Sequence, residues 1–127
     1  MPIDTVQRFF RCVEERDLER ALTHLTDDVV YHNVPFDPVS GRDAVRAVLG
    51  PFLAGFEEVQ WVVHHQFATG TLDQGMVMNE RLDRFRKGDA WLDLPVAGLF
   101  VIRHGQIALW RDYFDKDTML QGMAALG

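Results

Sequence analysis

Cysteine is nearly absent from this sequence, and other features that define whole classes of protein are missing as well. The single cysteine, Cys12, cannot form an intrachain disulfide and lies in an apolar-periodic stretch, so we expect a packed thiol and a reducing cytoplasm. No apolar run approaches the ~18 residues that span a membrane, and nothing near the N-terminus resembles a signal peptide. We therefore expect a soluble protein with no membrane partner.

Basic residues are too few for a nucleic-acid-binding protein. Thirteen Lys and Arg stand against nineteen Asp and Glu, which gives a net charge of -6 without a basic stripe. Small molecules and proteins remain as expected partners. A metal-binding motif is also missing: only His64 and His65 are adjacent, and neighbours in a strand point to opposite faces. We expect no metal site.

The first half of the chain has the apolar spacing and capping residues of helices. Two prolines and a glycine mark one loop, and Gly50-Pro51 should kink or divide the last of the helices. The expected elements are a helix from Asp4 or Thr5 to about Arg16, a helix capped by Asp17 that includes Leu25, an exit at 26–28, a strand over 29–34, a loop over 35–41 and a helix from Arg42 to Phe56.

Beyond residue 56 the apolar period changes to two, which predicts strands over 59–68, 75–86, 91–103 and 107–114. Short glycine-containing separators predict antiparallel hairpins, and the tail over 116–126 has the composition of a closing helix. Helices followed by a meander describe a single α+β domain over 1–127. We expect a curved antiparallel sheet that forms a cone wrapped around the N-terminal helices.

Polar residues interrupt strands that should face a core. Alternation places Asn79, Arg81 and Asp83 on one face of the second long strand, together with Val77 and Phe85. In the last strand the acid, Asp112, shares its face with Ala108, Trp110 and Phe114, and Tyr31 and Asn33 share a face of the first strand. Because buried charges are almost always paired, these strands predict a polar site inside the cone.

One cation between two acids is an arrangement suited to proton transfer. Burial raises the pKa of a carboxylic acid, whereas a guanidinium and hydrogen-bond donors lower it, so two acids that share Arg81 could supply an acid and a base together. The titration then belongs to the pair of Asp83 and Asp112.

The motifs carrying these residues resemble those of the limonene-1,2-epoxide hydrolases. The resemblance runs in order from about residue 29 to residue 115, through Tyr31-His32-Asn33-Val34-Pro35, Gly41-Arg42-Asp43-Ala44-Val45, Glu80-Arg81-Leu82-Asp83, Gly98-Leu99-Phe100 and 105–115, where Trp110-Arg111-Asp112-Tyr113-Phe114-Asp115 stands. It implies the cone-shaped fold shared with nuclear transport factor 2, SnoaL-like proteins and ketosteroid isomerase. It also implies a homodimer that uses no metal and no cofactor.

The resemblance further implies one-step addition of water to a small apolar epoxide, of cyclic or terpene type, to give a vicinal diol. Asp83 would take a proton from the attacking water while Tyr31 and Asn33 hold that water. Asp112 would donate a proton to the epoxide oxygen, and Arg81 would bridge both acids. No Gly-x-Ser-x-Gly elbow suggests the covalent route of other epoxide hydrolases.

Apolar residues near the predicted site suit an apolar substrate. The expected lining consists of Trp110, Val77, Phe85, Leu94, Val96, Leu99, Phe114, Phe36 and Met78. Apolar strand positions that could form a dimer interface are Trp61, Val63, Leu92 and Leu109.

Three other interpretations stay open at this point. Alternating Arg and Asp on a strand often form a solvated ion pair. A ketosteroid-isomerase-like or polyketide-cyclase-like enzyme would use the same fold, although a guanidinium beside its base would reduce that base's strength. A non-catalytic module that binds a small ligand is the third interpretation, because a fold does not determine a function.

Overall fold

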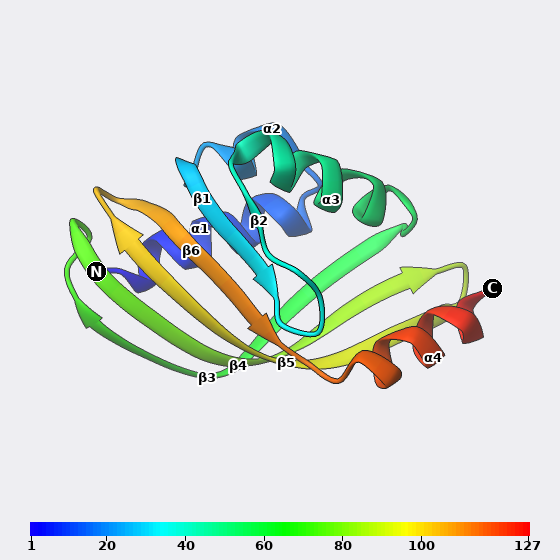
Figure 1. Cartoon of the computed structure of the whole chain (residues 1–127). Helices are drawn as coiled ribbons and strands as arrows, with labels where there is room; N and C mark the ends of the chain where they lie inside the picture. The colour runs from blue at the N-terminus through cyan, green and yellow to red at the C-terminus, as the bar shows by residue number, and fades with distance from the viewer.

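The computed structural model describes all of residues 1–127 and confirms the α+β class. Figure 1 shows the elements, which are α1 (Ile3–Glu14), α2 (Leu18–Leu22), β1 (Leu25–Asn33), β2 (Val39–Ser40), α3 (Arg42–Ala54), β3 (Glu58–Gly70), β4 (Gln74–Lys87), β5 (Ala90–Arg103), β6 (Gln106–Tyr113) and α4 (Lys116–Leu126). None of the four helices is long and apolar enough to cross a membrane.

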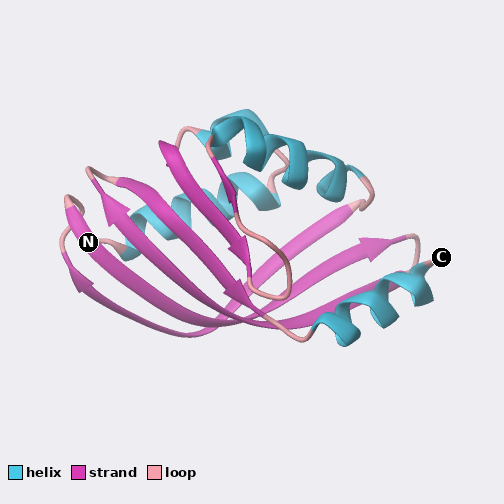
Figure 2. Ribbon diagram, in the orientation of Figure 1, coloured by secondary structure: helices cyan, strands magenta, loops and turns pink.

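The six strands form one strongly curved sheet in the order β2-β1-β6-β5-β4-β3. Strands β3 to β6 form the predicted antiparallel meander, whereas β1 joins β6 in parallel. The helices α1, α2 and α3 lie on the concave side of the sheet, and α4 runs beside the end of β5 (Figures 1 and 2). The sheet thus forms the expected cone around the helices.

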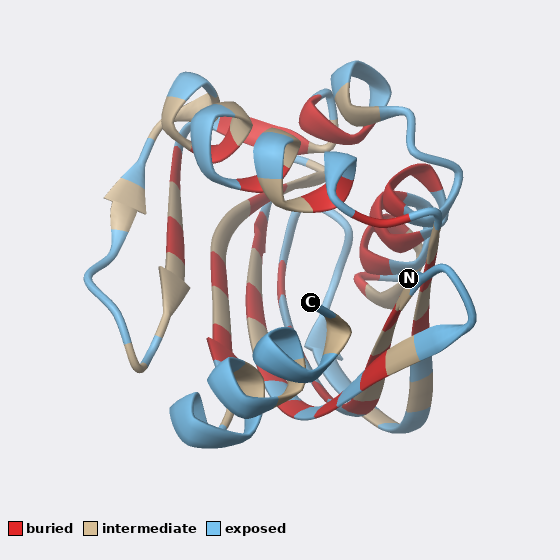
Figure 3. Cartoon of the chain, turned by 90° about the vertical axis from the view of Figure 1, so that its right-hand side faces the viewer, coloured by how far each residue is buried: buried red, intermediate tan, exposed pale blue.

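The core lies between α1 and the concave face of the sheet. The residues of α1 at helical spacing, Val6, Phe9, Phe10 and Val13, are almost completely buried, as their periodicity predicts. Burial of each such side chain contributes roughly 1.5–3 kcal/mol. Figure 3 shows the alternation of buried and exposed residues along the long strands. One continuous apolar cluster joins α1, α2, α3 and the sheet.

Three features of the first half of the chain differ from the prediction. Strand β1 begins at Leu25 and not at residue 29, because α2 ends at Leu22 and the buried Leu25 pairs with Ile107 of β6. Helix α3 continues through Gly50 and Pro51 to Ala54 without being divided. The predicted loop over 35–41 also holds the two-residue strand β2, which pairs with β1.

A bulge changes the predicted faces of β6. Val101 pairs with Leu109 and Ile102 pairs with Ile107, so Ala108 is an extra residue in β6. An extra residue reverses the alternation, which is why Ile107 is buried in the core although the sequence places it opposite Trp110. The prediction holds from Trp110 onward, where Trp110 and Asp112 both point inward.

Candidate active site

The inward face of β4 carries the polar residues predicted for it. Asn79, Arg81 and Asp83 are buried between Val77 and Phe85, while the intervening Met78 and Glu80 are exposed. The Arg81 side chain is fully inaccessible to solvent. The solvated-ion-pair interpretation is therefore wrong for this strand.

Every N–H of the Arg81 guanidinium donates a hydrogen bond. Nε and Nη2 donate to the two oxygens of Asp83 at 2.9 Å each. Nη1 and Nη2 donate to the two oxygens of Asp112 at 3.1 and 3.0 Å. The remaining Nη1 hydrogen is donated to Asn79 Oδ1 at 2.9 Å. Arg81 thus bridges two carboxylates from different strands in a planar, charge-assisted arrangement.

Aromatic rings surround this guanidinium. Its Cζ lies 5.0 Å from the ring centre of Phe10, 5.5 Å from that of Trp61 and 6.0 Å from that of Phe100. These rings exclude water and attract the cation through their faces. The ionic cluster is consequently held in an apolar setting, where each of its charges acts strongly on the others.

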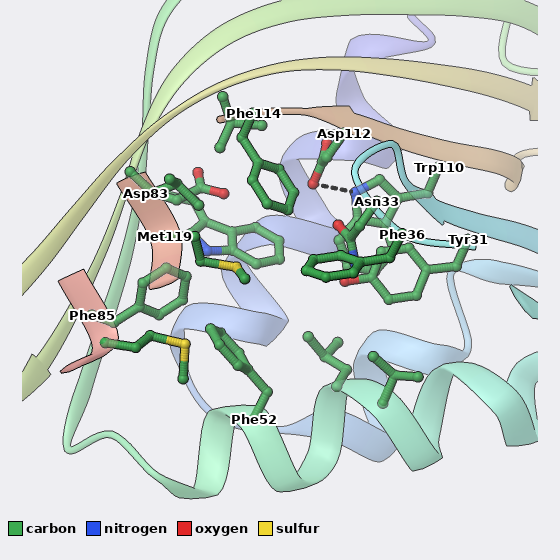
Figure 4. A pocket seen from close by; sticks show the side chains of 16 residues that line it. Tyr31, Asn33, Phe36, Phe52, Asp83, Phe85, Trp110, Asp112, Phe114 and Met119 are labelled. Carbon is green, nitrogen blue, oxygen red and sulfur yellow. Dashed lines mark hydrogen bonds between the residues drawn. The ribbon is translucent and has the colours of Figure 1, made fainter. Parts of the chain in front are cut away.

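Tyr31 and Asn33 reach the site from β1, on the side of Asp112. The parallel register sets Tyr31 beside Trp110 and Asn33 beside Asp112. The Tyr31 ring stacks on Trp110 with 4.0 Å between ring centres, and Trp110 Nε1 donates to Asp112 Oδ2 at 3.0 Å. Figure 4 shows that bond, with Tyr31 and Asn33 beside it. Asp112 accordingly accepts three N–H hydrogen bonds, two from Arg81 and one from Trp110.

The buried setting changes the acidity of the site. Burial raises the pKa of Asp83 to about 6, against the opposing effect of the Arg81 charge and its hydrogen bonds. Burial and the nearby Asp112 also raise the pKa of Tyr31, so its hydroxyl stays protonated. The two aspartates raise the pKa of Arg81 despite the burial that opposes its charge, which keeps it cationic.

A cavity of about 310 Å³ opens onto these groups (Figure 4). Thirteen of its sixteen lining residues are hydrophobic, and the others are Asn33, Asp83 and Asp112. No three His, Cys, Asp or Glu side chains converge in a way that could hold a metal ion. The cavity therefore presents two carboxyl groups, an amide and the Tyr31 hydroxyl to an apolar guest.

Most of the predicted lining residues do line this cavity, but three do not. Phe36, Phe85, Leu94, Val96, Trp110 and Phe114 lie on its wall. Val77 is fully buried in the core, while Met78 and Leu99 lie on the outer face of the sheet, in adjacent paired positions. The prediction for Val77 was wrong because alternation decides the face of a strand but not the position along it. The predictions for Met78 and Leu99 were wrong because both residues alternate away from the face that carries Asn79 and Arg81.

Several residues that line the cavity were not predicted from the sequence. They come from α3, β3 and α4 and are Val48, Leu49, Phe52, Trp61, Met119 and Met123. The apolar face of α3 was visible in the periodicity, but nothing in the sequence shows that α4 returns to the cavity. Trp61 and Leu92, expected at an interface, are instead buried, because both point into the cone.

Comparison with known proteins agrees with this geometry. The family model of the limonene-1,2-epoxide hydrolase catalytic domain matches residues 1–125. The chain belongs to the limonene-1,2-epoxide hydrolase family. This membership supports a hydrolase of the epoxide hydrolase type and confirms the resemblance found in the motifs.

Individual relatives of this epoxide hydrolase family member point the same way. The chain is 32% identical over 120 residues to epoxide hydrolase EphG of Mycobacterium tuberculosis, which covers 93% of this chain and 76% of EphG. A solved M. tuberculosis LEH-like epoxide hydrolase has a TM-score of 0.80 and 30% identity, covering 98% of this chain and 90% of that one. A Shewanella putrefaciens structure of the SnoaL-like polyketide cyclase type, with a TM-score of 0.82, 13% identity and coverage of 98% and 86%, shows only that the fold is shared.

Proposed function

We propose that this protein adds water to a small apolar epoxide, of cyclic or terpene type, and releases a vicinal diol in one acid–base step without metal or cofactor. One observation carries the proposal: Arg81 bridges two buried aspartates that both border an otherwise apolar cavity. Five residues would perform the reaction, and they are Arg81, Asp83, Asp112, Tyr31 and Asn33.

The chemistry of an epoxide explains the need for two acids. Ring opening releases strain but produces a strongly basic alkoxide, so a proton donated to the oxygen stabilises the transition state. Water is a weak nucleophile and needs a base that takes its proton. With one cation and two acids, a single shared proton makes the cluster neutral and leaves one acid and one base.

We propose Asp112 as the base and Asp83 as the acid, which reverses the roles inferred from the sequence. Tyr31 and Asn33 lie on β1, next to Asp112 and not next to Asp83, so a water that they hold is closest to Asp112. Asp112 accepts hydrogen bonds from three N–H groups, which suits an ionised carboxylate because it can only accept hydrogen bonds. The raised pKa of Asp83, about 6, suits the group that carries the proton.

In the proposed step the water oxygen forms a bond to one epoxide carbon as its proton passes to Asp112. The bond between that carbon and the epoxide oxygen breaks, and the oxygen receives the proton of Asp83. After release of the diol, one proton returns from Asp112 to Asp83 and restores the starting state. Each proton transfer typically contributes ~10²–10⁴-fold, and the fixed position of the water adds a proximity effect.

Single-turnover hydrolysis in ¹⁸O-labelled water tests this proposal. Purified protein in excess over cyclohexene oxide or limonene-1,2-epoxide, with chelator present, should yield diol that carries one solvent ¹⁸O in the first turnover. A covalent ester route would instead place an unlabelled carboxyl oxygen of the protein in the first diol. Absence of any diol from these and larger epoxides, from folded protein, would contradict the proposed function.

We also propose that the chain acts as a homodimer through the outer face of its sheet. That face carries the exposed side chains of Val62, Phe67, Met76, Met78 and Tyr113, together with half-buried Leu99 and Leu109. Of the interface residues expected from the sequence, Leu109 lies on this face, and Val63 packs partly against the core. One domain over 1–127 and a cytoplasmic location stay predictions.

A further inference from the structure

Gly98 lies at the centre of the site, although it does not border the cavity. It is the cross-strand partner of Asn79 on β4 and of Asp112 on β6. Its φ angle is not positive, unlike those of five other glycines in the chain, so its backbone conformation does not require glycine. The space around it must explain the residue type.

A side chain at position 98 would collide with the ionic cluster. A Cβ there would lie 2.4 Å from Arg81 Nη1, 2.9 Å from Asn79 Oδ1 and 2.9 Å from Asp112 Oδ1. The guanidinium would have to retreat by about 1 Å to reach an ordinary contact of 3.4 Å. Such a shift would stretch its hydrogen bonds, now 2.9 to 3.1 Å long, beyond bonding distance.

Asn79 holds the same guanidinium from another side. Its Oδ1 accepts the one Nη1 hydrogen that neither aspartate takes, and its Nδ2 lies 3.5 Å from Gln66 Oε1. Asn79 is buried and absent from the cavity wall. As a neutral acceptor it completes the hydrogen bonding of Arg81 without adding a third negative charge.

We propose that Gly98 and Asn79 are positioning residues that form a seat for Arg81 and hold its guanidinium where it bridges both aspartates. Their catalytic effect rests on the proposed function, but the seat itself can be tested without substrate. Since neither residue borders the cavity, both act through Arg81 and leave substrate binding unchanged.

Two variants and one control test the seat. Gly98→Ala adds a methyl group beneath the guanidinium, and Asn79→Asp replaces the neutral acceptor by a charged one of the same shape. Gly55→Ala is the control, because its new Cβ meets nothing closer than 3.4 Å and lies at the end of α3. Circular dichroism and thermal unfolding verify the fold of each protein.

The main readout is the ¹³C NMR titration of the aspartate carboxyl groups, with Asp83 assigned from Asp83→Asn. We expect Asp83 to titrate near pH 6 in the parent and about one pH unit or more higher in Gly98→Ala, because the Arg81 charge moves away from it. Asn79→Asp should also raise the pKa of Asp83, because it adds a negative charge to the cluster. Glu14, which also faces Asp83, is present in every protein and cannot cause a difference.

Activity supplies the second readout. We expect kcat of Gly98→Ala to fall ~10²-fold with KM within about twofold of the parent. A folded Gly98→Ala protein with the parent titration and kcat would overturn the proposal. If Gly98→Ala does not fold, a pKa of Asp83 that is unchanged in Asn79→Asp is sufficient to overturn the proposal. A parent that hydrolyses no epoxide would contradict the proposed function. The titration would still show whether Gly98 and Asn79 position Arg81.

Discussion

Arg81 is the residue on which the site depends. It is a buried cation that pairs with two buried aspartates, and removal of one partner from such a cluster typically costs about 3–5 kcal/mol because a charge is left uncompensated. With one proton shared between the two aspartates, one negative charge balances the positive charge of Arg81 and the cluster is neutral. The cluster therefore needs one shared proton for two reasons. The proton makes the buried cluster neutral, and it leaves one aspartate as acid and the other as base.

The pH dependence of kcat/KM tests this requirement. Asp83 has a pKa raised to about 6, so the pair loses its proton as pH rises through that value, and kcat/KM should then fall about tenfold per pH unit. The measurement is kcat/KM on cyclohexene oxide from pH 5 to 9, corrected for hydrolysis without protein. A rate constant that stays level or rises between pH 6 and 9 would show that no such proton is needed.

The elements could be predicted from sequence wherever a local pattern decided them. The helical period in α1 and the alternation in β4 correctly placed Phe9, Arg81 and Asp83 inside the cone. Long-range pairing could not be predicted, because no hairpin joins β1 to β6 and their parallel register has no local signal. The resemblance implied roles for the two aspartates without this contact, and the proposed reversal of those roles rests on it.

Helix α4 shows a second limit of local patterns. None of its residues is fully buried, yet Met119 and Met123 border the cavity, and Gly122 brings the helix close against Leu92. A weak apolar stripe on a short C-terminal helix does not reveal its docking site. Because Met119 and Met123 line the cavity, we expect α4 to limit the length of the substrate.

Filling the cavity from α4 should therefore affect large substrates selectively. Met119→Trp should lower kcat/KM for limonene-1,2-epoxide at least ~10-fold more than for the smaller cyclohexene oxide, since small changes of fit in apolar pockets have effects of this size. Parallel kinetics with Leu120→Trp, which changes an exposed neighbour on the same helix, provide the control. Equal losses for both epoxides would show that α4 does not limit substrate size.

At the scale of the whole molecule, the sheet has two faces with different uses. The concave face holds the core and the site, while the outer face carries a row in which Phe67 pairs with Met78 and Met78 pairs with Leu99. Exposed apolar rows on paired strands are characteristic of association surfaces. The outer face is therefore the expected contact between two copies of the chain.

Negative charges introduced on the outer face of the sheet should separate the two chains of the proposed dimer. Sedimentation velocity should give twice the 14.6 kDa chain mass for the parent and the single mass for Phe67→Glu/Met78→Glu. Leu120→Glu, which places the same charge at another exposed apolar position, should leave the dimer intact. A parent that sediments as a monomer, or a double variant that stays dimeric, would contradict this surface.

The most direct test of the whole account compares Asp83→Asn and Asp112→Asn in the presence of azide. Both variants should lose diol formation from an epoxide that the parent hydrolyses. Azide needs no base, so it should restore ring opening, as the azido alcohol, in Asp112→Asn only, because that variant keeps the proton donor Asp83. Rescue of Asp83→Asn instead would contradict the assigned roles, and full diol formation by either variant would contradict catalysis by the two aspartates.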